Sequence, residues 1–169
     1  MAEIANTRIG SFLGGIASTE PAPGAGSAAA VVLALGLACA RKAVAMTLRH
    51  HPDTADLIGL GAHLEGLGEQ ALAGGDADMR CFTAYIEAMQ RPKEDAARAP
   101  AEQDALADLV AVGENLVAIG DEARAKLLEV KTDIYPTMIN DIAAALALIA
   151  AARGIHGSCV AESRRSLDS

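Results

Sequence analysis

The chain has very few aromatic residues: no tryptophan, two tyrosines and two phenylalanines among 169 residues. Its hydrophobic residues, 51% of the sequence, must therefore supply a core that is mainly alanine, leucine, valine and isoleucine. Such a core favours closely approaching helices over a β-sandwich, which depends more on β-branched and aromatic side chains. The length is sufficient for one domain with a sizeable core.

Positive charge is also scarce. Fourteen Lys and Arg residues stand against 22 Asp and Glu, which gives a formal net charge of −8 and an isoelectric point near 4.9. A surface of this sign repels polyanions. We predict that nucleic acid is not a partner.

Cysteine is limited to Cys39, Cys81 and Cys159, and each lies in an apolar segment without metal-ligand spacing. This pattern is typical of buried, reduced thiols in a cytosolic protein, without a disulfide framework. His63 and His156 are isolated and the sequence contains no HxxxH motif, so no metal site is predicted.

A long uninterrupted membrane span is missing. The run from Ser27 to Ala40 is short for a bilayer and ends at Arg41-Lys42, and the run from Ile142 to Ala152 is shorter still. We interpret both as buried helices. The N-terminal region lacks a basic start followed by an apolar run, so we predict no secretory signal, no membrane partner and a cytoplasmic location.

Apolar residues recur at steps of three and four along most of the chain, which predicts an all-α fold. We expect an antiparallel bundle of about five helices forming a single domain over residues 1–169. The predicted helices cover residues 5–17, 27–49 and 57–89, a fourth helix carrying Leu106 to Val130, and a fifth after Tyr135-Pro136. Gly74-Gly75 is expected to interrupt or kink the third helix, and residues 94–103 to form the main loop.

The loop Pro21-Ala22-Pro23-Gly24-Ala25-Gly26-Ser27 leads directly into the second helix. Its glycines allow close backbone approach, and the start of a helix offers unpaired N–H groups that can bind a carboxylate, a phosphate or a carbonyl-bearing heterocycle. The alternative is a purely structural loop in which Ser27 or Gly26 caps the helix.

Two carboxylates are placed on otherwise apolar helix faces. Asp78 precedes Phe82 by one turn on a face that also carries Tyr85, and Asp141 lies near Met138 and Ala145. A buried acid loses hydration, which raises its pKa towards values useful for acid–base chemistry. Helix capping or a solvated position is the competing interpretation for each.

Three spaced segments resemble the cyclodeaminase/cyclohydrolase family, which includes the cyclodeaminase domain of formiminotransferase-cyclodeaminase and stand-alone methenyltetrahydrofolate cyclohydrolases. They cover nearly the whole chain in the family's order. The segments are Ser11 to Ala29, including the Pro/Gly loop; Asp78-Met79-Arg80-Cys81-Phe82 with the later Arg91-Pro92-Lys93; and Asn140-Asp141-Ile142-Ala143.

The chain departs from the family pattern where the family has amides or glycine. Ala25 replaces the middle glycine of the loop, and asparagines of the family correspond here to Ala45, Tyr135, Ser158 and Glu162. Side-chain amides both donate and accept hydrogen bonds, so their loss implies altered recognition of a pterin-like ligand.

The resemblance implies a homodimer that acts on a tetrahydrofolate derivative as substrate, without a metal or redox cofactor. It implies either closure of an N5-formimino group onto N10 with loss of ammonia, or hydrolysis of the methenyl bridge. The catalytic residues implied are Asp78, Asp141 and Lys93, the last as an anion or substrate contact. The substrate-binding residues implied are Pro23, Gly24, Gly26, Ser27, Phe82 and Tyr135. The alternatives are a pocket retuned for another small molecule, or a non-catalytic binding or assembly protein.

Overall fold

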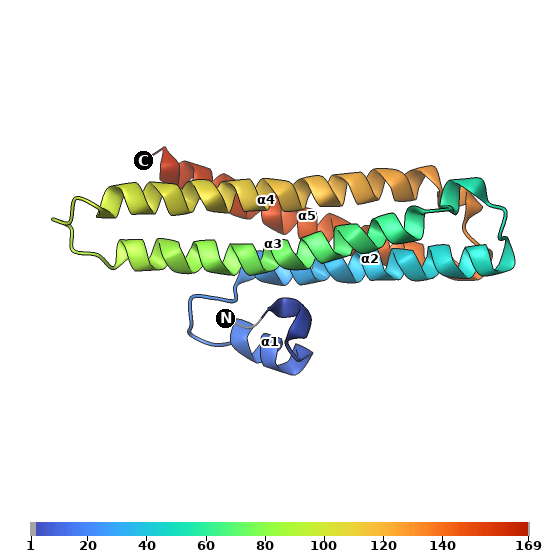
Figure 1. The fold of residues 1–169 in the computed structure, drawn as a ribbon, viewed down its shortest axis with the longest axis horizontal. Coiled ribbons are helices and arrows are strands. Elements are labelled where there is room, and N and C mark those ends of the chain that lie inside the picture. The colour runs from blue at the N-terminus through green and yellow to red at the C-terminus, as the bar shows by residue number, and fades with distance from the viewer. Residues whose placement is uncertain (1–2, 169) are drawn as a thin grey trace.

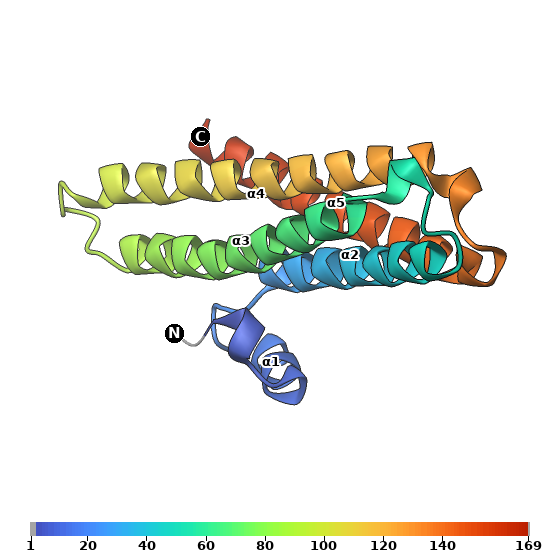
Figure 2. The same ribbon diagram turned by 45° about the vertical axis from the view of Figure 1, so that its right-hand side comes forward.

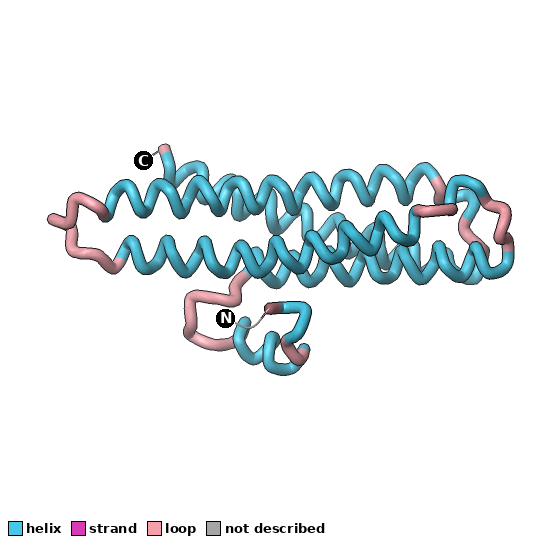
Figure 3. The backbone as a smooth tube through the Cα atoms, in the orientation of Figure 1, coloured by secondary structure: helices cyan, strands magenta, loops and turns pink. Residues whose placement is uncertain are grey.

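Four long helices lie side by side in a computed structural model that describes residues 3–168 (Figure 1). They are α2 (Ala25–His50), α3 (Leu60–Met89), α4 (Arg98–Glu129) and α5 (Ile139–Leu167). A short helix, α1 (Ile9–Ile16), precedes them. The described residues contain five α-helices and no strand, and the elements between them are loops and single 3₁₀ turns (Figure 3). The predicted all-α bundle is confirmed.

Glycine and alanine set the spacing of the helices. A Cβ added at Gly74 would lie 2.7 Å from a methyl group of Leu116 on α4, and one at Gly75 would lie 2.9 Å from the Cβ of Ala30 on α2. Both glycines are therefore required by packing, and α3 continues through them as one helix. The predicted interruption at this pair does not occur.

Helix α4 begins at Arg98, inside the region that the sequence predicts to be a loop. Pro100 falls in the first turn, where the missing N–H has no partner in any helix, so it does not delay the start. Gly113 and Gly120 of α4 lie against Val160 and Arg153 of α5, as the sequence predicts for close helix contact.

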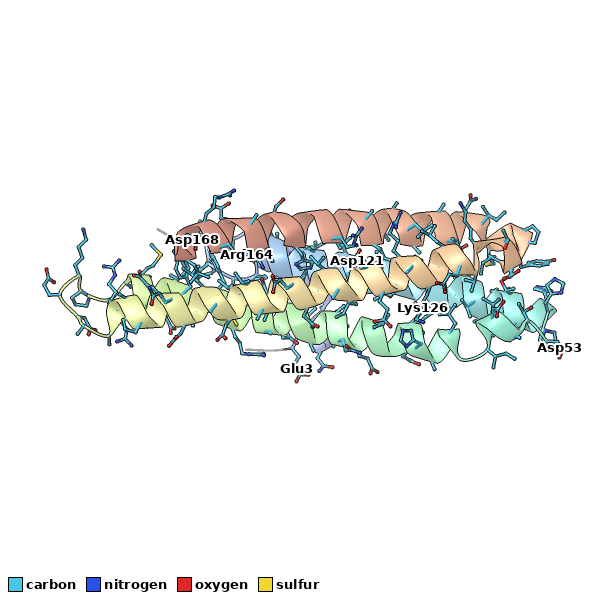
Figure 4. The ribbon with its side chains drawn as sticks, turned by 90° about the horizontal axis from the view of Figure 1, so that it is seen from above. Glu3, Asp53, Asp121, Lys126, Arg164 and Asp168 are labelled. Atoms are coloured by element: carbon cyan, nitrogen blue, oxygen red, sulfur yellow. The ribbon has the colours of Figure 1, made fainter. Side chains whose placement is uncertain are left out.

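Ion pairs line the outer edge of the contact between α4 and α5. Arg153 pairs with Asp121, and Arg164 pairs with Glu114. Asp121 and Arg164 can be followed along these two helices in Figure 4. All four side chains are at least 30% exposed, so these pairs contribute little to stability beyond orientation.

The N-terminal segment packs against the bundle near the start of α2 (Figures 1 and 2). Ile4 and Phe12 form a small apolar cluster with Met79 of α3. The backbone N–H of Ile4 donates to Asp76 Oδ1 at 2.9 Å. These contacts fix the N-terminal segment, and with it the approach to the Pro/Gly loop.

The helices do not start level with one another. The loop between α3 and α4 lies at one end of the bundle, and α3 and α4 extend towards that end well beyond the first residue of α2 (Figure 1). The N-terminus of α2 therefore lies partway along the other three long helices, back from their ends (Figure 1). This staggered start positions the site described below.

Two helices, Ala25–His50 and the stretch Pro136–Leu167, are long and apolar enough to cross a membrane by length and composition. The most apolar window is 44% buried in the first and only 22% buried in the second. The prediction of buried helices thus fits α2 better than α5. Much of the outer α5 face is small and exposed, including Ala143, Ala147, Ala150 and Gly154.

The three cysteines are free thiols, as predicted, but each is half-buried rather than fully buried.

Candidate active site

A cavity of about 430 Å³ lies at the N-terminus of α2. All four long helices and the preceding loop contribute to its lining, which places it where the staggered start of α2 leaves room. The lining residues are Ala22, Gly24, Ala25, Gly26, Asp78, Phe82, Tyr85, Leu106, Leu109, Ser158, Cys159, Glu162, Ser163 and Ser166.

Asp78 is the most perturbed acid of this cavity. It lies in the middle of α3 and not at a helix end, so helix capping does not explain it. Burial raises the pKa of the Asp78 carboxyl from 3.8 to about 6, and a hydrogen bond from the backbone of Ser27 partly opposes that rise. A carboxyl with this pKa exchanges protons readily near neutral pH, which is the property required of a general acid or base.

Gly26 allows Asp78 to reach the start of α2. A Cβ at position 26 would overlap the Asp78 carboxylate, 2.5 Å from its Cγ and 2.6 Å from its Oδ2. Glycine is thus the residue that fits at this position, and the positive end of the α2 dipole faces the acid. The sequence predicts that a ligand approaches the backbone at Gly26. In this structure the group that lies against Gly26 is the Asp78 carboxylate of the same protein.

Ser27 serves the helix rather than the cavity. Its hydroxyl donates to the Gly24 carbonyl at 3.1 Å and lies 3.0 Å from the Gly24 N–H, and its side chain is fully buried. This is the capping interpretation of the sequence, and Ser27 is absent from the cavity lining. Pro23 also lies outside the lining and packs against Gly15 of α1.

Phe82 and Tyr85 form the aromatic wall of the cavity, one turn and two turns after Asp78. Their ring centroids are 6.3 Å apart with planes tilted by 46°. Leu106 and Leu109 from α4 add an aliphatic surface. The cavity therefore combines one buried acid with apolar walls that suit a flat ring system.

Tyr135 and Asp141 lie at the other end of the bundle. Asp141 is in the first turn of α5 and pairs with Lys42 of α2 at 3.1 Å. It precedes the cavity residue Ser158 by 17 positions, which is about 25 Å along an α-helix. The ring of Tyr135 stacks on His50 at 4.3 Å. Within one chain, Asp78 and Asp141, which the sequence implies as catalytic residues, therefore do not lie in the same pocket.

Lys93 is exposed in the loop between α3 and α4 and is not part of the cavity lining. Of the nine residues proposed from the sequence, the structure brings together Gly24, Gly26, Asp78 and Phe82.

Sequence reasoning did not assign site roles to the α5 residues of the cavity. In the sequence, Ser158 and Glu162 differ from the asparagines that the family resemblance implies. That difference is the one sequence feature that could have indicated their place in the site. Cys159 lies between them, and burial, followed by the nearby Asp78 charge, raises the pKa of its thiol. The neutral thiol is a poor nucleophile, so Cys159 is better viewed as part of the wall.

His156, one turn before Val160 on α5, is 1% exposed, and its Nε2 has no hydrogen-bond partner in the structure. Burial lowers the pKa of His156 to about 4, so the ring is neutral at pH 7. Among residues 3–168, no group of three or more His, Cys, Asp or Glu side chains is arranged to bind a metal ion.

The fold and cavity define a helical-bundle protein in which a carboxyl of raised pKa, from α3, lies against the start of α2. A family model described as formiminotransferase-cyclodeaminase matches residues 8–160. The chain belongs to this family, which confirms the resemblance seen in the sequence.

A solved structure similar to this chain is formiminotetrahydrofolate cyclodeaminase from Thermotoga maritima. The match has a TM-score of 0.88 at 17% sequence identity, and it covers 98% of this chain and 82% of that one. At this identity the likeness concerns the fold. A search among curated proteins gave no match.

Proposed function

We propose that this protein is a folate-linked one-carbon enzyme, either a formiminotetrahydrofolate cyclodeaminase or a methenyltetrahydrofolate cyclohydrolase. The observation that carries the proposal is Asp78: a carboxyl with a pKa of about 6 in a 430 Å³ cavity with apolar walls. Family membership supplies the substrate class. Both reactions occur at a carbon atom flanked by nitrogens and require proton transfer to and from the nitrogen or oxygen atoms bonded to it. Neither requires oxidation or reduction.

In the cyclodeaminase reaction, N10 attacks the carbon of the N5-formimino group, which reacts in its protonated, amidinium form. Asp78 as carboxylate accepts the proton that N10 loses, which gives a neutral tetrahedral adduct. Asp78 then returns the proton to the amino group, the C–N bond breaks, and ammonia leaves with formation of the 5,10-methenyl cation. In the hydrolytic alternative, Asp78 takes a proton from the water that attacks the methenyl carbon. It returns this proton to N5 as the bond between that carbon and N5 breaks, and it accepts the hydroxyl proton as the formyl C=O forms on N10, so that one proton is released to solvent overall.

The direct experiment offers purified protein 5-formimino- and 5,10-methenyl-tetrahydrofolate and follows the methenyl absorbance. Appearance of the absorbance identifies a cyclodeaminase, and its accelerated disappearance identifies a cyclohydrolase. Silence on both substrates, with folded protein, contradicts the folate reaction. It would favour a pocket retuned for another small molecule, which the substitutions at Ser158 and Glu162 also suggest.

We propose that the chain forms a homodimer, in which a second copy packs on the exposed apolar face of α2 and α5. Leu35 is 52% exposed, and Ile155 of α5 is 38% exposed. Exposed small residues of α5, such as Ala147 and Gly154, permit another helix to approach closely. An antiparallel arrangement would place the Asp141 end of one copy beside the cavity end of the other, opposite the basic residues Arg164 and Arg165.

Because Asp141 cannot reach Asp78 within one chain, a shared catalytic role requires the two acids to come from different copies. We predict that Asp78→Asn and Asp141→Asn are each inactive, and that mixing them after dissociation and reassembly restores activity. Half of the dimers would then be mixed, with one intact site of two, so about a quarter of wild-type activity is expected.

Lys42→Gln is the control, because it breaks the ion pair with Asp141 but keeps the carboxylate. If Asp141→Asn is fully active, or if the mixture stays inactive, Asp141 does not act at the partner's cavity. The oligomeric state is measured separately, by the molar mass of the wild-type protein in solution. A folded monomer at micromolar concentration contradicts the proposed dimer.

A further inference from the structure

The cavity contains a second carboxylate, at a position where the resemblance described above implies an asparagine. Glu162 lies one turn beyond Ser158 on α5, across from the α3 wall, and both residues line the cavity. No Lys, Arg or His is present among the lining residues. The charged side chains that face a bound molecule there are thus acids.

Glu162 is available to a ligand. Its side chain is 78% exposed at the rim, and its ion pair with Arg165 is long, at 3.6 Å, with both side chains largely in solvent. Such a pair contributes little energy and is easily exchanged for another partner. Asp78, by contrast, is half-buried against the start of α2. The cavity therefore has one acid at depth and one at its entrance.

The difference between an asparagine and a glutamate is chemical and not only steric. An amide presents one acceptor atom and one donor group, whereas an ionised carboxylate presents two acceptors. Two parallel N–H donors on neighbouring atoms match a carboxylate in the bidentate geometry seen with guanidinium groups. A ligand atom pair consisting of an acceptor and a donor does not.

We propose that Glu162 is a specificity-determining residue that accepts two hydrogen bonds from an amidine-like N–C–N edge of the bound ring system. For the pterin ring of a folate, whose choice here rests on the proposed function, that edge is N3–H together with the 2-amino group. The apolar walls, Phe82 and Leu109 included, then contact the flat body of the ring. The one-carbon group is left for Asp78.

The test compares binding of 6-methylpterin with binding of 6-methyllumazine, in which an oxo group replaces the 2-amino group. Wild-type protein should bind the pterin about tenfold more tightly, since a hydrogen bond to a charged group that remains near solvent is worth roughly one such factor. Glu162→Gln should lose that preference, because its amide can donate to the 2-oxo group of the lumazine.

Glu87→Gln is the matched control. Glu87 is exposed on α3, two residues beyond Tyr85, and lies outside the cavity lining, so the variant removes the same charge at the same end of the bundle. It should keep the wild-type preference. An unchanged preference in Glu162→Gln, a lost preference in Glu87→Gln, or absence of any preference in the wild type overturns the proposal.

The binding test examines the role of Glu162, and the turnover assay examines the folate reaction, so a negative result in one does not decide the other. A tenfold preference that depends on Glu162 in a protein without turnover supports this recognition role while contradicting the folate reaction. Turnover with a kcat/KM that Glu162→Gln leaves unchanged, together with equal binding of the two probes, supports the reaction and overturns the role of Glu162.

Discussion

Asp78→Asn is expected to lower turnover of the folate substrate by about a hundredfold to ten-thousandfold, the usual loss when a proton-transferring side chain is removed. Asparagine keeps the size of the side chain and an oxygen that can accept the Ser27 hydrogen bond, but it cannot take up a proton. Ligand binding should therefore persist. In the wild type, kcat/KM should fall as the pH drops below about 6, because the Asp78 carboxylate becomes protonated at its raised pKa.

The same substitution should make the protein more stable at neutral pH. The pKa of Asp78 is about 6 in the folded state against 3.8 as its ordinary value. The folded protein thus binds the proton more tightly than the unfolded chain. The resulting stability is fully present below pH 3.8 and is lost as the pH rises through 6. At pH 7 the ionised carboxyl costs on the order of 3 kcal/mol, which asparagine avoids.

Urea unfolding of both proteins at pH 7 and pH 4 measures this difference. The variant should gain stability over the wild type at pH 7, and the gain should shrink at pH 4. Loss of activity combined with loss of stability would instead show that Asp78 is a structural residue. A variant as active as the wild type would remove Asp78 from the proposed mechanism.

Gly26→Val is expected to abolish ligand binding, with affinity reduced by at least about a hundredfold, while the helical content is retained. The new side chain would occupy the position of the Asp78 carboxylate and force it into the cavity. A displaced acid both blocks the ligand and is no longer aligned with the start of α2. Calorimetric titration with 6-methylpterin and circular dichroism give the two readouts.

Gly66→Val provides the control for this substitution. Gly66 also lies in a helix, but a Cβ there meets no atom within 4 Å, so binding and fold should both remain. If Gly26→Val binds the ligand as tightly as the wild type, the cavity at the start of α2 is not the binding site.

Apolar periodicity in the sequence was enough to predict the bundle, because helices with alanine- and leucine-rich faces bury them in few other ways. It misplaced the elements where packing overrides local preference. Gly74 and Gly75 look like helix breakers, yet each faces a side chain of a neighbouring helix that leaves no room for a Cβ. Pro100 looks like part of a loop, yet it occupies a first turn where its missing N–H has no cost.

Some residues of the candidate site could be predicted from the sequence, and others could not. The residue types and their order singled out Asp78, Phe82 and the glycines of the loop, because a carboxyl on an apolar helix face and a glycine before a helix are visible locally. The α5 side of the cavity was not visible in this way. Ser158 and Glu162 are ordinary polar residues near the end of a helix, and only the packing of α5 on α2 and α4 brings them to the cavity that Asp78 lines.

By itself, then, the sequence determined the helical class and the family, since each depends on periodicity or on short local motifs, and it singled out Asp78 and Asp141 as two candidate acids. The tertiary structure decided which distant residues meet. It placed Asp141 and Tyr135 at the other end of the bundle from the cavity that Asp78 lines, because Asp141 lies in the first turn of α5 and the cavity residues of α5 begin at Ser158. It also gave Asp78 its raised pKa, because desolvation depends on what packs around a carboxyl and not on its neighbours along the chain.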